Sequence, residues 1–172
     1  MKHAGPMEIE IKVRIPSLAL VRPRLEQAGF SLVHPQGPET SILWDQGGAL
    51  GAQGSALRLR RYAGTATLTW KGMRVADPRL KIRPEVETKV ADGEAMEAIL
   101  AALGFAPTLT MVKSRSLWAR GELEACLDET PFGCFLELEG PRTAIDFALA
   151  ELGLGDAPVE LRGYATLFGA TE

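Results

Sequence analysis

Charged residues recur at every second position in four segments of the chain, and both signs of charge are represented. The four sets are Glu8, Glu10 and Lys12; Arg58 and Arg60; Arg83, Glu85 and Glu87; and Glu137 and Glu139. Apolar residues fill the positions between them. Because successive side chains of a strand point to opposite faces, each segment is predicted to form a strand with one ionic and one apolar face. Neighbouring like charges destabilise an exposed sheet, so four such strands favour a shared charged interior.

The side chains that this alternation turns inward suit a divalent cation and a polyanion. Carboxylates two positions apart repel each other, and a hard cation such as Mg²⁺ or Mn²⁺ relieves the repulsion. Arginine matches phosphate oxygens with paired hydrogen bonds, while lysine acts as a point charge. The pattern therefore predicts a metal–polyphosphate site. Its predicted bases are Lys12, Arg58, Arg60, Lys71, Arg83, Lys113 and Arg115, and its predicted acids are Glu8, Glu10, Glu85, Glu87, Asp128, Glu137 and Glu139.

Length and composition indicate one ordinary globular domain. The chain has 172 residues, 46% of them hydrophobic and 24% charged, with a formal net charge of −3. This balance lacks the basic footprint of a general nucleic-acid binder. No apolar run approaches the roughly 18 residues that a membrane helix needs. Residues 1–6 contain no apolar signal core and are expected to form a flexible tail. We expect a cytoplasmic protein that binds neither nucleic acid nor a membrane.

The two cysteines do not predict a disulfide or a zinc site. Cys126 shares the strand phase of Asp128, whereas Cys134 is out of phase with Glu137, so the two thiols should point to opposite faces. The chain has only two histidines, and neither lies near a cysteine motif.

Periodicity and turn residues predict a meander of strands with three helices. The predicted strands are 8–14, 41–44, 55–62, 66–71, 80–90, 109–118, 123–130 and 134–139. The predicted helices are 18–28, which Ser17 would cap, 94–103 and 143–152, while 159–168 fits either a helix or a strand. The glycine-rich segment 45–54 is expected to be a hairpin or lid loop, since it lacks the Gly-Lys-Ser/Thr ending of a phosphate loop.

Short turns between neighbouring strands argue for an antiparallel α+β fold. The helices each have an apolar face, and the aliphatic strand face, which includes Trp70 and Trp118, is their natural partner. We therefore predict an eight-stranded antiparallel barrel that is charged inside and covered by helices outside.

The ordered set of motifs resembles the CYTH superfamily, the triphosphate tunnel metalloenzymes. Glu8-Ile9-Glu10-Ile11-Lys12 is similar to the Glu-x-Glu-x-Lys signature that opens the family. The resemblance continues through Leu57–Arg60, Trp70–Gly72, Arg83–Glu87, Lys113–Arg115, Asp128 and Glu137–Gly140. Arg162-Gly163-Tyr164 is similar to the closing basic-Ser-Tyr motif, with glycine where serine is common. The resemblance covers nearly all of the chain and implies a single domain over residues 1–172.

The resemblance also implies roles for individual residues around a triphosphate and Mg²⁺ or Mn²⁺. The implied metal ligands are Glu8, Glu10, Glu137 and Glu139, with Asp128 and Glu87 placing a second metal or the attacking water. The implied phosphate-binding residues are Lys12, Arg58, Arg60, Lys71, Arg83, Lys113 and Arg115. Arg162 would contact a terminal phosphate or the leaving group, and it completes the implied catalytic set of Lys12, Glu87 and Asp128.

Several functions fit this resemblance, and the sequence orders them. The leading hypothesis is hydrolysis of a linear triphosphate, with inorganic tripolyphosphate as the first candidate substrate. It is preferred because Thr40–Asp45, with Leu50 and Ala56–Arg60, resembles the phosphatase-like branch of the family. The alternatives are a class IV adenylyl cyclase, a thiamine triphosphatase and a sensor that binds polyphosphate or a nucleotide without turnover. The expected partner is a small-molecule triphosphate, and the sequence does not decide whether the protein forms a homodimer.

Overall fold

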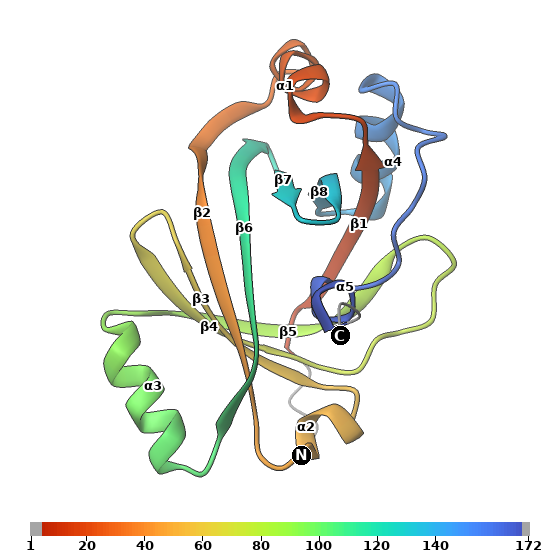
Figure 1. Cartoon of the computed structure of the whole chain (residues 1–172). Helices are drawn as coiled ribbons and strands as arrows, with labels where there is room; N and C mark the ends of the chain where they lie inside the picture. Colours follow the sequence, from red (N-terminus) through yellow and green to blue (C-terminus); the bar gives the residue numbers. More distant parts are fainter. Residues whose placement is uncertain (1–4, 170–172) are drawn as a thin grey trace.

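Eight antiparallel strands close into one barrel in the computed structural model, which describes residues 5–169 (Figure 1). Around the ring the order is β1-β5-β4-β3-β2-β6-β7-β8, and every neighbouring pair is antiparallel. The closed antiparallel barrel predicted from the sequence is thus confirmed. The strands are β1 Met7–Ile15, β2 Ser31–Asp45, β3 Ala56–Tyr62, β4 Thr65–Lys71, β5 Lys81–Val90, β6 Ala106–Arg120, β7 Leu123–Thr130 and β8 Gly133–Glu139.

Three of the helices lie where the sequence predicts them. These are α1 Leu18–Gln27, α3 Gly93–Ala102 and α4 Arg142–Glu151, and two short helices are added, α2 Ala49–Ala52 and α5 Tyr164–Gly169. Asp92 caps α3, since its carboxylate accepts hydrogen bonds from the backbone N–H groups of Glu94 and Ala95. Ser17 stands at the N-cap position of α1, but its side chain makes no capping hydrogen bond, so that part of the prediction is wrong.

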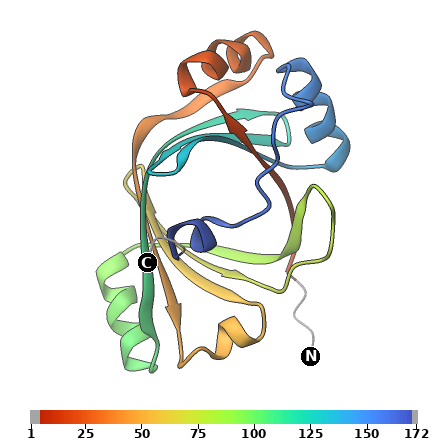
Figure 2. The ribbon, with the colours of Figure 1, turned by 45° about the vertical axis from the view of Figure 1, so that its right-hand side comes forward.

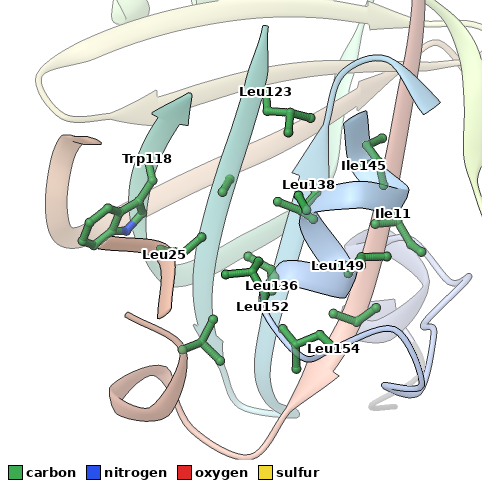
Figure 3. Packing of buried hydrophobic residues seen from close by; sticks show 14 of the residues in the cluster. Ile11, Leu25, Trp118, Leu123, Leu136, Leu138, Ile145, Leu149, Leu152 and Leu154 are labelled. Atoms are coloured by element: carbon green, nitrogen blue, oxygen red, sulfur yellow. The ribbon is translucent and has the colours of Figure 1, made fainter. Parts of the chain in front are cut away.

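The main hydrophobic core lies outside the barrel wall, between the strands and the helices α1 and α4. On β1 the alternation is direct, because Ile11 and Val13 are buried in this core while Lys12 between them lines the cavity of the barrel. Figure 3 shows Leu149 of α4 packed among apolar side chains of the wall, with Trp118 at the other side of the cluster. The barrel is therefore apolar outside and charged inside, as its strand alternation predicts.

Strand β2 is much longer than the predicted segment 41–44. It spans 15 residues and pairs with β6 over most of its length, with register shifts between Leu32 and His34 and between His34 and Gly37. Pro35, Gly37 and Pro38 break the sequence pattern, and such residues are tolerated in strands mainly at edges and bulges. The extension matters because it brings Glu39 into the wall of the barrel.

The glycine-rich connection joins β2 to β3, which pair antiparallel, so it is a hairpin connection as expected, and it contains the short helix α2. The Asp45 carboxylate fixes it by accepting hydrogen bonds from the backbone N–H groups of Gln46, Leu50 and Gly51, at 2.6, 3.0 and 3.0 Å. These amide groups are therefore satisfied within the connection, and its residues do not line the barrel cavity. The expectation that this segment is no phosphate loop agrees with that geometry.

The ambiguous C-terminal segment is part strand-like and part helix. Val159 forms an isolated bridge with Val13, and the Glu160 N–H donates to the Lys12 carbonyl at 2.8 Å. The chain then enters α5, which Figure 2 shows within the outline of the ring of strands. At the other end, residues 1–4 of the predicted tail lie outside the described residues. The carbonyl of Pro6 accepts a 3.0 Å hydrogen bond from Glu85 N–H, so that part of the tail is held.

The packing of α4 gives a stability prediction. Leu149 is 1% exposed and Phe147, on the same helix, is 62% exposed. Leu149→Ala should lower the free energy of unfolding by about 2–5 kcal/mol, because it leaves a cavity in the core. Phe147→Ala should change it by only about 0.5 kcal/mol. Urea denaturation of both variants measures the difference, and equal losses would contradict this placement of the core.

Candidate active site inside the barrel

Side chains from the inner faces of the strands enclose a cavity of about 610 Å³. The cavity brings together nearly all of the charged residues predicted to face inward. Those that line it are Glu8, Glu10, Lys12, Arg58, Arg60, Lys71, Arg83, Glu85, Glu87, Lys113, Arg115, Glu137 and Glu139. Asp128 and Arg162 are the two predicted site residues that do not line it.

One wall of the cavity is basic and is built by β3 and β6, the two strands that flank β2. Arg58 and Arg60 of β3 lie beside Glu87 of β5, with Nη2–carboxylate distances of 3.6 and 3.3 Å. Thr69 donates a 2.6 Å hydrogen bond to the same Glu87 carboxylate. Glu87 therefore steadies both guanidinium groups from the side and leaves them facing the cavity.

Asp128 orients the two bases of β6. Its carboxylate accepts two 2.6 Å hydrogen bonds from the Arg115 guanidinium, one of 3.0 Å from Lys113 and one of 2.6 Å from the Tyr164 hydroxyl. Asp128 is completely buried. A carboxylate engaged on both oxygens by bases positions those bases, and in this structure Asp128 points to them and not into the open cavity.

Glu39 of β2 completes this buried network, and the sequence pattern did not single it out. It is 3% exposed and lies 3.5 Å from the Lys113 ammonium and 3.4 Å from the Arg115 guanidinium. Burial by itself would raise the pKa of Glu39, but Arg115 and Lys113 hold that pKa down at about 2. Glu39 is therefore an anion that keeps the basic wall compact.

The opposite wall, β1 with its neighbours, carries the carboxylates, and lysines hold most of them. Lys71 contacts Glu8 at 3.0 Å and also Glu85, and Lys81 contacts Glu10 at 2.5 Å. In β8, Glu137 receives a 2.5 Å hydrogen bond from Arg115, and it lies 3.6 Å from Lys12. Arg83 reaches Glu8 at 3.5 Å. Further described residues that line this part of the cavity without having been predicted are Arg74, Lys81 and Glu124.

Lys12 lines the cavity and is fully buried. Its ammonium donates a 3.0 Å hydrogen bond to the carbonyl of Arg162 and lies 3.6 Å from the centre of the Tyr164 ring. Burial, opposed by the attraction of Glu137, lowers the pKa of Lys12 to about 8. Lys12 is therefore a cation at neutral pH whose charge a nearby anion would stabilise.

The C-terminal motif contributes its tyrosine to the cavity and directs its arginine elsewhere. The guanidinium of Arg162 pairs with Glu160 at 2.7 Å, and its side chain is 56% exposed. Tyr164 instead lines the cavity, where its ring lies against both Lys12 and Lys113, at 3.6 and 3.9 Å from the two ammonium groups. The signal for Tyr164 was its place in the motif, and the signal for Lys81 was its shared phase with Arg83.

Glu139 forms no ion pair among residues 5–169, a property that it shares with the exposed Glu124 and with none of the other cavity carboxylates. It lies opposite Glu10 in the register of β1 and β8. Loss of hydration around its carboxyl, added to the negative charges of Glu8 and Glu10, raises the pKa of Glu139 to about 8, although the residue as a whole is exposed. Oxygen donors that repel each other in this way fit a hard divalent cation. In the described part of the chain, no three acidic groups are already placed together as a metal site.

The match to a family model decides the family. The model of the CYTH domain covers residues 6–151. The chain belongs to the CYTH domain family. The predicted membership and the predicted fold are both confirmed. Among residues 5–169 we find no helix long and apolar enough to cross a membrane.

A named relative agrees with this membership, and solved structures share the fold. The chain is 32% identical, over 77% of its length and 76% of the relative's, to a Methanocaldococcus jannaschii protein named "Putative adenylate cyclase MJ0240". Two structures share the fold at a TM-score of 0.82 and 0.78. The first is a Vibrio parahaemolyticus protein described as a "putative adenylate cyclase", with 22% identity over 96% of this chain and 99% of the other. The second is PH1012 from Pyrococcus horikoshii, with 21% identity over 94% of this chain and 99% of the other.

A third structure with the same fold carries a statement about activity. It is HpAC1 from Hippeastrum, an adenylyl cyclase candidate described as having a dominant triphosphatase activity. Its TM-score is 0.69 and its identity 19%, and the match covers 96% of each chain. At this identity the likeness shows the fold alone, and the stated activity is that of the Hippeastrum protein.

The raised pKa of Glu139 predicts how stability depends on pH without metal. Native Glu139 keeps its proton up to about pH 8, whereas the ordinary pKa is 4.5, so this residue favours the native state less and less as pH rises from 4.5 to 8. Glu139→Gln, which cannot ionise, should therefore stabilise the protein relative to wild type more at pH 8 than at pH 5. Thermal melts in EDTA measure this.

A surface control separates this effect from a general loss of negative charge. Glu26→Gln on the exposed face of α1 removes one carboxylate far from the cavity. Its melting-temperature difference from wild type should change little between pH 5 and pH 8. If Glu139→Gln behaves in the same way, then the crowding of Glu139 with Glu8 and Glu10 is not energetically significant.

Proposed function

We propose that this protein hydrolyses a linear triphosphate inside the barrel, with inorganic tripolyphosphate as the first candidate and Mg²⁺ or Mn²⁺ as the cofactor. The observation that carries the proposal is the sorting of charge around the cavity. β3 and β6, which hold Arg58, Arg60 and Arg115, each lie three strands away from β1 in the ring, and β1 with β8 holds the carboxylates Glu8, Glu10, Glu137 and Glu139. A cation and a polyanion would thus each meet a wall of opposite charge.

The basic wall has unused hydrogen-bonding capacity that suits phosphate. The buried Nε of Arg58 has no hydrogen-bond partner among the described residues. In β5, the Nε of Arg83 makes no hydrogen bond either, although it lies 3.5 Å from the Glu8 carboxylate. Leaving a buried donor unpaired costs free energy, and an anion in the cavity would recover it. Arg60, Lys113 and Arg115 would extend the same surface along the substrate. Lys12 and Lys71 would add point charges at its centre.

The carboxylates Glu8, Glu10, Glu137 and Glu139 would hold the metal. When bound, a divalent cation neutralises phosphate charge and helps to form the nucleophile. The protein's own part is to align the triphosphate between the two walls and to supply guanidinium groups to the equatorial oxygens of the transferred group. Glu87 and Asp128 would orient the arginines, because both already contact them. Arg162 would need to leave Glu160 before its side chain could contact a terminal phosphate.

Adenylyl cyclase activity is the second candidate, favoured by the name of the Methanocaldococcus jannaschii relative. A cyclase must hold adenine so that the ribose 3′-hydroxyl meets the α-phosphorus. The two tyrosines that line the cavity already donate their hydroxyls within the protein, Tyr62 to the carbonyl of Arg115 and Tyr164 to Asp128. Those two hydroxyls are therefore not available to hydrogen-bond a purine, whereas the lining offers many charged groups to phosphates.

A substrate panel tests the reaction. We expect phosphate release from tripolyphosphate in Mg²⁺ or Mn²⁺ at a higher kcat/KM than from ATP or thiamine triphosphate, and none in excess EDTA. Cyclic AMP and pyrophosphate from ATP at a faster rate would establish the cyclase instead. Faster turnover of thiamine triphosphate would establish that activity, and metal-dependent binding without any turnover would indicate a sensor.

A charge-removing variant tests the basic wall. Arg60→Gln removes a guanidinium whose hydrogen bonds to phosphate would contribute about 1.5–3 kcal/mol, so kcat/KM for tripolyphosphate should fall about 10- to 100-fold. Arg22→Gln, which removes an exposed arginine of α1, serves as the control and should leave kcat/KM unchanged. Equal effects of the two substitutions would rule out phosphate binding at β3.

A further inference from the structure

Lys81 is a buried lysine that the sequence pattern did not single out. It is 4% exposed, stands opposite Glu10 in the register of β5 and β1, and donates a 2.5 Å hydrogen bond to the Glu10 carboxylate. It also lines the cavity. Lys81 thus supplies a positive charge to one of the carboxylates that would bind the metal.

The pairing of Lys81 is simpler than that of its neighbour Lys71. Lys71 contacts two carboxylates, Glu8 and Glu85, and so keeps a partner if one of them turns away. For Lys81, the only carboxylate within ion-pair distance in the described chain is Glu10. Releasing Lys81 therefore breaks one ion pair and frees Oε1 of Glu10, the oxygen that the ammonium contacts.

An ammonium and a divalent cation compete for the same carboxylate oxygens. An ammonium beside Glu10 neutralises its charge and also repels an arriving cation, so both effects lower metal affinity. The absence, within residues 5–169, of three acidic groups already gathered around one point agrees with a site whose acids are held by lysines. An acid cluster without such a counter-ion would instead attract a cation strongly.

We propose that Lys81 is a built-in competitor of the divalent cation: it neutralises Glu10 in the metal-free protein and is displaced when the metal binds. This inference rests on the metal site of the proposed function, and it makes Lys81 a residue that sets metal affinity. Its displaced ammonium remains within the cavity that it lines. Metal binding therefore exchanges one cation for another at Glu10 and adds positive charge to the cavity.

The test is a titration with Mn²⁺ in the absence of any phosphate, with free Mn²⁺ followed by electron paramagnetic resonance. Lys81→Met should bind Mn²⁺ about tenfold more tightly than wild type, because the repelling charge is gone. Lys81→Arg keeps the charge and should stay close to wild type. Lys89→Gln, on an exposed residue of the same strand, is the control and should not change Mn²⁺ affinity. Unchanged or weaker binding by Lys81→Met, or no binding by any variant, would overturn the proposal.

A measurement on wild-type protein covers the case in which Lys81→Met does not fold. The ¹⁵N resonance of the Lys81 ammonium, identified by its loss in Lys81→Arg, should shift as Mg²⁺ is added. A resonance that stays fixed while calorimetry shows Mg²⁺ binding would contradict displacement. Both measurements omit substrate, so they can succeed when triphosphate hydrolysis is not found, and hydrolysis can be found when they fail.

Discussion

Compensation of charge inside the barrel is the constraint on which the rest of the structure depends. Ionised groups taken out of water are costly unless each meets an opposite charge or a hydrogen-bond partner. The barrel meets this requirement by placing Arg115 against Asp128, Glu39 and Glu137, and Lys71 against Glu8 and Glu85. Glu139 forms no ion pair among residues 5–169, and loss of hydration together with the charges of Glu8 and Glu10 raises its pKa.

The same constraint explains why the core lies outside the barrel. A strand whose inner residues are charged has only its outer face to bury, so helices must cover that face. Ile11 and Val13 of β1 pack with Leu25 of α1 and Leu149 of α4, while Lys12 between them faces the cavity. No residue of α1 or α4 lines the cavity, whereas α5 contributes Tyr164 to it. Helices α1 and α4 hold the wall in a shape that keeps two sets of opposite charges facing each other.

Strict alternation made the fold and most of the site predictable. The alternating charged residues Glu8, Glu10, Lys12, Arg58, Arg60, Glu137 and Glu139 of β1, β3 and β8 all line the cavity as expected, whereas Arg14, in the same phase of β1, does not. The same alternation also predicts that Lys81 faces inward, since it lies two positions before Arg83, although the predicted set of bases on β5 began at Arg83. Glu39 was not predictable in this way, because Pro35, Gly37 and Pro38 with their bulges hide the phase of β2.

Side-chain partners explain why two predicted site residues do not line the cavity. Asp128 and Arg162 carry the residue types expected of a site, yet Asp128 is occupied by Arg115, Lys113 and Tyr164, and Arg162 is occupied by Glu160. The partners of Asp128 come from distant segments, and strand periodicity contains no information about them. Glu160 is a local partner of Arg162, but the alternation of a strand does not indicate that pairing either. The short helix α5 depends on such neighbours as well, since Tyr164 lies against Lys12 and Lys113.

A crystal structure with tripolyphosphate and Mn²⁺ tests the central claim most directly, since anomalous scattering locates the manganese independently of the phosphate. The account predicts one tripolyphosphate within the cavity, with its oxygens on Arg58, Arg60, Lys113 and Arg115, and manganese on the side of Glu10, Glu137 and Glu139. Tripolyphosphate bound only on the outer surface, or manganese at a site away from these carboxylates, would contradict it.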